Sequence, residues 1–299
     1  MTDLINPGTH KQSYSPADPE QHRALGALPL SLHGRSRVIM GLNPDARELE
    51  GPLRSLLEQG VHKLPEFRRS RHAVVYRLER ADLPFPLFIK QFNLRNRWDY
   101  LKLLFRSSRA WRTLRANAVV ERQGFQVEPV LGWAEYSRYG FVWRSFLITR
   151  EIPTAHEAHH LLSRPELGHP RGSPQRYRFI EELGKEVGAW HRAGLHHGDL
   201  RLSNILVQCP QDHYHFFWMD NERTRRFACL PNGLRVHNLS QLISDRNALS
   251  RSDILRFWHG YQQTSGFTPR NKKSFARRII RRTRRKWKRK ERRNNRRVA

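Results

Sequence analysis

The chain has 299 residues, 38% of them hydrophobic, which is enough for one large folded core or two smaller ones. Two cysteines are too few for a disulfide framework or a cysteine zinc site, and no uncharged apolar run reaches the length of a membrane span. The net charge is +28; residues 270–299 hold 17 Lys and Arg against the single acid Glu291, a net of +16, which leaves +12 for the rest. This charge suits a polyanionic partner, namely nucleic acid, an anionic membrane or a phosphate-rich glycolipid.

The first half of the chain is predicted to be mostly β-structure. Residues 1–35 are polar and contain prolines, without the apolar core of a signal peptide, so we expect an irregular or disordered segment that precedes a cytoplasmic protein. Residues 36–150 are rich in aromatic and β-branched residues, which favour strands. The predicted elements are strands over 37–40, 73–78, 86–92 and 141–149, and a helix that Ser108 caps and Gly124 ends.

Residues 151–268 are predicted to be mainly helical. The clearest helix has Ser173 as N-cap and Pro174 at its first position, where a missing N–H costs nothing, and it ends at Gly194. The order of strands, one helix, strands and then helices indicates an α+β fold. The later predicted elements are a hairpin of strands 205–207 and 214–219 and a helix over 249–263.

One segment after the long helix has the spacing of a kinase catalytic loop. Residues 197–207 match the pattern His-x-Asp-Leu-x-x-x-Asn followed by a β-run, and Asp220 comes sixteen residues after Asn204. Phosphoryl transfer depends mainly on positioning and on neutralising the charge of the triphosphate. We therefore predict Asp199 as the catalytic carboxylate that faces the acceptor hydroxyl, and Asn204 and Asp220 as the Mg²⁺ ligands that hold ATP. Asp and Asn are also common in turns, but that alternative does not account for the whole set and its spacing.

A strand-end lysine and several departures complete the kinase pattern. Lys90 follows the run Leu87-Phe88-Ile89 in the predicted strand 86–92, as the lysine of a kinase Val-Ala-Ile-Lys strand does, where it can bind the α- and β-phosphates of ATP. No glycine-rich loop precedes it, because Arg-Arg-Ser-Arg stands at 68–71. The helix predicted after it, from Ser108 to Gln123, offers only Glu121 as a carboxylate partner. Asn-Glu, not Phe-Gly, follows Asp220. Gly198 stands where regulated protein kinases have an arginine that pairs with an activation-loop phosphate, which argues against that control. The His-Gly-Asp pattern resembles that of small-molecule phosphotransferases of the aminoglycoside and choline type, which favours a non-protein acceptor.

With these motifs the chain resembles the lipopolysaccharide kinase (Kdo/WaaP) family, over about residues 53–263. The resemblance is most specific over 88–99, 197–207 and 233–242. It implies a two-lobed protein-kinase-like fold with an N-lobe over 36–150 that binds the nucleotide and a catalytic C-lobe over 151–268. It also implies ATP and Mg²⁺ as cofactors and the phosphorylation of a sugar hydroxyl, of Kdo or heptose, in the lipopolysaccharide inner core. The acceptor is then lipid A-core at the cytoplasmic face of the inner membrane of a Gram-negative bacterium.

Other functions remain open at this point. Another small-molecule kinase or a protein kinase has the same motifs, and a basic nucleic-acid-binding protein on a degenerate kinase scaffold is a further alternative, although we do not expect nucleic acid as the partner. The pattern His-Glu-x-x-His over 156–160 is typical of zinc metallopeptidases. We do not favour a peptidase, because the run directly follows a predicted strand and that pattern needs a long helix to present both histidines.

The basic tail, residues 269–299, is predicted to form an amphipathic helix with Thr268 as N-cap and Pro269 at its first position. A basic amphipathic helix suits an anionic membrane surface, with its apolar stripe in the bilayer. A solvated, disordered tail is the alternative, and no helix is expected beyond Lys288. The expected apolar stripe consists of Phe275, Ile279, Ile280, Thr283 and Trp287.

Overall fold

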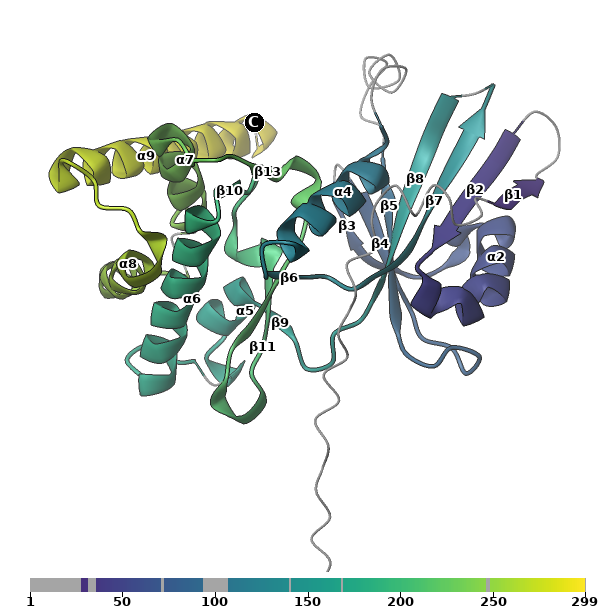
Figure 1. The fold of residues 1–299 in the computed structure, drawn as a ribbon, viewed down its shortest axis with the longest axis horizontal. Helices are drawn as coiled ribbons and strands as arrows, with labels where there is room; N and C mark the ends of the chain where they lie inside the picture. Colours follow the sequence, from purple (N-terminus) through teal and green to yellow (C-terminus); the bar gives the residue numbers. More distant parts are fainter. Residues whose placement is uncertain are drawn as a thin grey trace, which may run out of the picture.

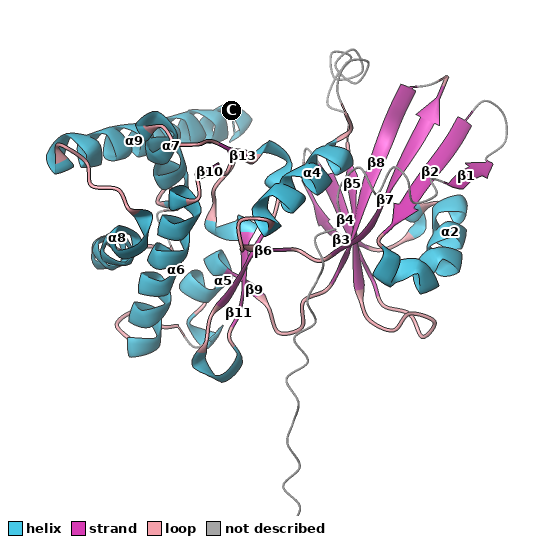
Figure 2. Ribbon diagram, in the orientation of Figure 1, coloured by secondary structure: helices cyan, strands magenta, loops and turns pink. Residues whose placement is uncertain are grey.

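The computed structural model describes residues 28–31, 36–70, 73–93, 107–139, 141–167, 169–245 and 248–298. They form a β-rich N-lobe and a helical C-lobe, joined by the segment between β8 and β9 (Figures 1 and 2). The predicted α+β, two-lobed fold is confirmed. No described helix is both long enough and apolar enough to cross a membrane.

The N-lobe is built on one antiparallel sheet with the strand order β1-β2-β7-β8-β5-β4-β3. Its side chains alternate between two faces, as expected for pleated strands. Phe146 and Ile148 of β8 belong to the cluster that includes helix α2 (Glu50–Gln59), whereas Leu147 packs with helix α4 (Arg109–Glu121). The strands are β1 (Leu28–Ser31), β2 (Ser36–Leu42), β3 (Glu66–Arg69), β4 (Ala73–Leu78), β5 (Leu87–Phe92), β7 (Val130–Arg138) and β8 (Phe141–Arg150).

The C-lobe is organised around the contact between two helices, α6 (Pro174–Arg192) and α8 (Arg251–Ser265). They approach closely because glycines line the contact: a Cβ on Gly184 would clash with the carbonyl of Phe257, and a Cβ on Gly260 with the carbonyl of Glu181. The other elements are α5 (Ala158–Ser163), α7 (Asn232–Leu242), α9 (Lys272–Val298), the sheet β6 (Gln126–Val127), β12 (His215–Trp218), β11 (Ile205–Gln208) and β9 (His156–Glu157), and the pair β10 (Leu195–His196) and β13 (Arg225–Arg226).

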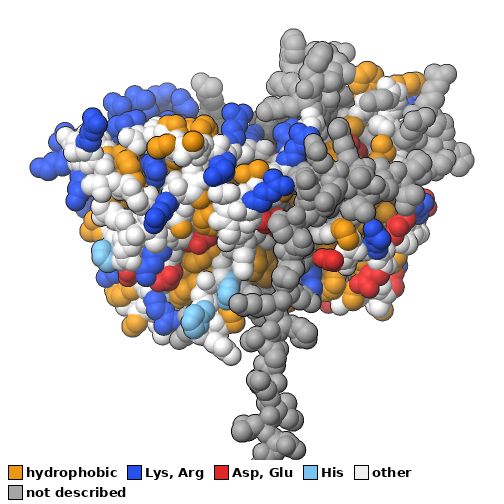
Figure 3. Space-filling view, in the orientation of Figure 1, with side chains coloured by type: hydrophobic (Ala, Val, Ile, Leu, Met, Phe, Trp, Pro, Cys, Tyr) orange, Lys and Arg blue, Asp and Glu red, His pale blue; other side chains and the backbone are white. Residues whose placement is uncertain are grey.

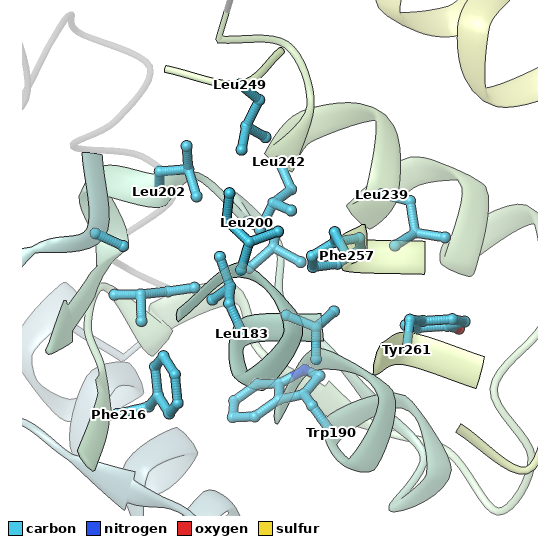
Figure 4. Packing of buried hydrophobic residues seen from close by; sticks show 14 of the residues in the cluster. Leu183, Trp190, Leu200, Leu202, Phe216, Leu239, Leu242, Leu249, Phe257 and Tyr261 are labelled. Carbon is cyan, nitrogen blue, oxygen red and sulfur yellow. The ribbon is translucent and has the colours of Figure 1, made fainter. Parts of the chain in front are cut away.

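The segment predicted as the catalytic loop is anchored in the C-lobe core. Figure 4 shows Leu200 and Leu202 pointing into a cluster with Leu183, Leu242 and Phe257. Leu200 is fully buried and Leu202 is 2% exposed. Two apolar anchors on either side of an exposed residue fix the backbone between them, so the polar residues of this loop are held in defined positions.

The predicted helix boundaries are close to those observed. Ser173 caps α6 by accepting a hydrogen bond from the backbone N–H of Arg176 (3.2 Å), and Ser108 caps α4 in the same way. The helix predicted over 249–263 is α8, which Ser250 caps. Within residues 1–35, which we expected to be irregular, the structure describes β1, which pairs with β2; the rest of that segment lies outside the described residues.

The tail is helical, but its boundaries differ from the prediction. Helix α9 begins after Asn271, whose Oδ1 accepts a hydrogen bond from the backbone N–H of Ser274 (2.9 Å), so Thr268 is not its N-cap. The helix continues past Lys288, where we expected none, to Val298. In Figure 1 it lies along α7.

Most of the apolar stripe of α9 faces protein, so the prediction that the stripe enters a bilayer is wrong; of its members, Ile280 is exposed. Phe275 and Ile279 are 5% and 8% exposed and belong to the C-lobe core, and Thr283 is 2% exposed. The indole Nε1 of Trp287 donates to the backbone carbonyl of Ser244 (2.7 Å). Burial against α7 removes from water the same apolar area that membrane insertion would have removed.

Candidate active site

The predicted catalytic aspartate and the first predicted metal ligand are joined by a hydrogen bond. Asn204 is 9% exposed, and its Nδ2 donates to the backbone carbonyl of Asp199 (2.8 Å). Oδ1 is therefore the atom that Asn204 can offer to a metal. The carboxylate of Asp199 is 37% exposed; its Oδ1 accepts from Nε of Arg201 (2.9 Å) and from Nε2 of Gln241 (3.3 Å).

The hairpin of β11 and β12 returns the second predicted metal ligand to the same place. The backbone N–H of Met219 donates to the carbonyl of Asn204 (3.0 Å), so Asp220 directly follows a residue bonded to the first ligand. Asp220 has a left-handed backbone (φ 58°), a conformation that aspartate tolerates better than most residues. Its carboxylate contacts Nζ of Lys90, which β5 extends from the N-lobe.

A buried glutamate that the sequence did not indicate lies beside this ion pair. Glu128 follows β6, and its Oε1 is buried without a hydrogen-bond partner among the described residues. Burial raises the pKa of Glu128 to about 7, although the charge of Lys90 opposes that rise. For Lys90, burial alone would lower the pKa, but the charges of Asp220 and Glu128 outweigh it and raise the pKa. Burial would raise the pKa of Asp220, and the lysine reverses this, so the lysine–aspartate pair stays ionised.

A buried histidine and helix α7 hold the backbone of the catalytic loop by hydrogen bonds. His197 is fully buried; its Nδ1 accepts from the backbone N–H of Asp199 (3.1 Å), so its Nε2 carries the proton and donates to the carbonyl of Met219 (2.9 Å). The backbone N–H of His197 donates to Oδ1 of Asn238 (3.1 Å), and that of Leu200 to Oε1 of the α7 glutamine (3.2 Å). These bonds link the segment after β10, which carries Asp199, to the segment after β12, which carries Asp220.

Gly198 allows the catalytic loop to approach the segment after Asp220. A Cβ at this position would clash with Cβ of Arg223. That residue belongs to the short helix η6 (Asn221–Arg223). Glycine is thus required here by close packing, which is a separate reason from the acceptor preference inferred from sequence.

Ion pairs and amide bonds occupy the positions that follow Asp220, where we noted the absence of Phe-Gly. The guanidinium of Arg109, at the start of α4, binds Glu222 through two bonds, of 2.5 and 3.0 Å. Glu222 is 8% exposed in its side chain. The buried Asn221 donates to Oδ1 of Asn117 of α4 (2.9 Å). Helix α4 therefore holds η6, and through it Asp220, by polar contacts.

The zinc alternative is not supported by the geometry. His156 lies in β9, where it pairs with Val207 of β11, whereas His160 lies in α5. Glu157 between them binds Arg68 (2.6 Å). The two histidines therefore do not share one helix face, as this zinc motif requires.

Comparison with known proteins agrees with this arrangement. The model of the lipopolysaccharide kinase (Kdo/WaaP) family matches residues 61–261, more than half of the chain. The chain belongs to the lipopolysaccharide kinase (Kdo/WaaP) family. Like the members of this family, it is a kinase. No curated protein matches this Kdo/WaaP kinase in sequence.

The solved structures similar to this Kdo/WaaP kinase include "WaaP in complex with acyl carrier protein", at 18% identity and a TM-score of 0.53, over 82% of this chain and 98% of that one. Two variants of the PknI kinase domain of Mycobacterium tuberculosis are also similar. They have 15% and 13% identity and TM-scores of 0.34 and 0.38, over 52% and 71% of this chain and 57% and 79% of theirs. At this identity the WaaP structure supports the fold.

Several residues around the site of this Kdo/WaaP kinase were missed from the sequence. Asn238 and Gln241 lie inside the segment 233–242 that carried part of the resemblance, so that motif could have suggested a role. Glu128 sits between two β-elements and has no local pattern. Its position beside Lys90 depends on a contact between distant segments.

Proposed function

We propose that the protein transfers the γ-phosphate of ATP to a hydroxyl of a lipopolysaccharide inner-core sugar, Kdo or heptose. The observation that carries this proposal is the convergence of Lys90 from the N-lobe with Asp220, Asn204 and Asp199 from the C-lobe. A cation, two oxygen donors and an accessible carboxylate are the groups that phosphoryl transfer requires.

Asp199 is the base in this proposal. Arg201 and Gln241 both bind its Oδ1, so the acceptor hydroxyl has Oδ2 to bind. The acceptor oxygen forms a bond to the γ-phosphorus while the bond from that phosphorus to the bridging oxygen breaks. The hydroxyl proton passes to the carboxylate, and ADP is the leaving group.

The residues present fit Mg²⁺. The amide oxygen of Asn204 and the carboxylate of Asp220 are hard oxygen donors, and the bond between Met219 and Asn204 keeps them together. When bound, Mg²⁺ neutralises charge on the triphosphate. Lys90 would then bind the α- and β-phosphates from the N-lobe side, next to Asp220.

We also propose that the protein works at the cytoplasmic face of the inner membrane, on lipid A-core. Because most of the apolar stripe of α9 is buried, membrane attraction rests mainly on charge, and Figure 3 shows Lys and Arg gathered at the α9 end of the molecule. Each such residue near an anionic surface contributes about 1 kcal/mol. Binding to anionic vesicles should therefore fall steeply with added salt.

Two variants test the chemistry. Asp199→Ala should retain nucleotide binding and lower turnover by about 10² or more, because it removes the group that faces the acceptor. Asp220→Ala should instead remove the Mg²⁺-dependent thermal shift that ATP produces. A wild-type protein with no Mg²⁺-dependent shift for any nucleotide would refute the proposal and favour a degenerate scaffold.

The acceptor is tested separately. Mass spectrometry of lipid A-core from strains with and without the gene should differ by one phosphate on a Kdo or heptose residue. An unchanged core, together with ATP turnover on another small molecule or on a protein, would assign the acceptor to one of the alternative kinase classes.

A further inference from the structure

Two cations of α9 lie on the catalytic side of the C-lobe. Helix α7 connects them to the catalytic loop: its Gln241 side chain donates to Asp199 (3.3 Å), while the carbonyl of the adjacent Ser240 accepts from Oγ1 of Thr283 of α9 (3.4 Å). Arg282 adjoins Thr283 in sequence, and Lys286 lies one turn further on, on the same side of the helix.

The two residues differ in burial. Lys286 is half-buried, whereas Arg282 is exposed, as are Arg281 and Lys288 on the opposite side of the helix. Burial, together with the charges of Arg201 and Arg282, lowers the pKa of Lys286 to about 8, while the charge of Asp199 opposes this. Lys286 is thus half-buried on the side of α9 that packs against α7, the helix whose Gln241 side chain donates to Asp199.

A histidine on α7, His237, lies between the catalytic loop and the two α9 cations. His237 stacks on His196 at the start of the catalytic loop, with ring centroids 5.3 Å apart. Burial and the charges of Arg282 and Lys286 lower the pKa of His237 to about 4, and the charge of Asp199 opposes them. Burial also lowers the pKa of His196 to about 4, so both histidines are neutral at pH 7.

The two α9 cations have no acidic partner of their own. Among the described residues, no carboxylate forms an ion pair with Arg282 or Lys286. Unpaired cations kept near a catalytic base attract an anion, and here the nucleotide is expected on the other side, between Lys90 and Asp220. The acceptor is the remaining reactant.

We propose that Arg282 and Lys286 bind an anionic group of the acceptor, a phosphate or a carboxylate next to the hydroxyl that Asp199 activates. This inference rests on the proposed kinase function and adds the requirement that the acceptor be charged. It gives part of the basic tail a role in substrate selection.

The test is a matched pair of double variants of the full-length protein. Arg282→Gln with Lys286→Gln removes the proposed site, and Arg281→Gln with Lys288→Gln removes one Arg and one Lys from the outward face of the same helix. The acceptor is deacylated lipid A-core oligosaccharide, used with its phosphates and after enzymatic dephosphorylation.

The inward pair should raise KM for the phosphorylated acceptor by about tenfold or more, the scale expected for losing charged hydrogen bonds, with KM for ATP unchanged. The outward pair should change either KM by less than about twofold. Wild type should prefer the phosphorylated acceptor if the anion is a phosphate; an equal preference with the same inward-pair effect points to a carboxylate. The single variant Lys286→Arg keeps the positive charge and should keep most of the affinity for the acceptor.

Equal effects of the two pairs, or an inward-pair effect on KM for ATP, would overturn the inference. Calorimetric titration of the oligosaccharide into protein without nucleotide separates this failure from a failure of the proposed function. Binding that depends on Arg282 and Lys286 without phosphate transfer would refute the proposed kinase acceptor but keep the anion site. Transfer with no dependence on these residues would keep the function and refute the site.

Discussion

Two adjacent isoleucines of α9 provide a direct test of how the helix is bound. Ile279 is 8% exposed and belongs to the C-lobe core, whereas Ile280 is 46% exposed. Replacing each by alanine removes the same atoms from neighbouring positions of one helix. Only the first replacement should leave a cavity.

The expected difference follows from burial. Truncating a buried isoleucine to alanine destabilises a protein by about 2–5 kcal/mol, and Ile279 should fall near the lower end because it lies at the edge of the core. Exposed positions change the free energy of unfolding by about 0.5 kcal/mol or less. Ile279→Ala should therefore lower the midpoint of thermal unfolding by roughly 4–8 °C, and Ile280→Ala by roughly 2 °C at most.

Thermal and urea unfolding followed by tryptophan fluorescence would measure both variants. Trp258 contacts Phe275, with ring centroids 5.9 Å apart, and Trp287 donates to the carbonyl of Ser244, just after α7. Equal shifts for Ile279→Ala and Ile280→Ala would refute the packing of α9. If Ile279→Ala instead lost vesicle binding without a change in stability, the hypothesis that the apolar side chains of α9 insert into a bilayer would be supported again.

Three further predictions concern the C-lobe. Gly198→Ala should lower the thermal midpoint and reduce turnover by about tenfold or more, because the new Cβ meets Arg223; unchanged kinetics would contradict the close approach. His156→Ala and His160→Ala should change turnover by less than about twofold, and metal analysis should find no stoichiometric zinc; about one zinc per chain, lost in these variants, would revive the metallopeptidase. The pKa of His237 is lowered to about 4 in the folded protein. As pH falls from about 6.5 toward 4, this histidine is protonated in the unfolded chain but not in the folded one, so the free energy of unfolding decreases over that range. His237→Gln should make the free energy of unfolding, measured with urea between pH 7 and 5, less dependent on pH, by the equivalent of about one bound proton. An unchanged pH dependence would show that the pKa of this histidine is not lowered in the folded protein.

Local signals were sufficient where the chain determines its own conformation. The caps Ser108 and Ser173 were read correctly because capping depends on hydrogen bonds within three residues. The spacing of Asp199, Asn204 and Asp220 likewise identified a set that the structure brings together, because one loop and one hairpin connect them. Their catalytic roles stay predictions.

The errors arose where the outcome depends on distant segments. The periodicity of α9 identified an apolar face but not whether lipid or protein covers it, since both remove the same surface from water. The partner of Lys90 was sought on the helix that follows it, α4, but the structure supplies Asp220 as its contact and Glu128 as a second nearby charge. Neither contact has a periodic or short-range signature.

Helix α7 explains why the tail and the active site are connected. On one side Asn238 and Gln241 bond to the catalytic loop; on the other, Ser240 and, just after the helix, Ser244 accept hydrogen bonds from α9. A displacement of α9 would therefore disturb the helix that orients Asp199, even without loss of charge. The basicity of the tail thus has two parts in our proposals: exposed cations that attract an anionic surface, and the pair Arg282 and Lys286, which binds the acceptor beside Asp199.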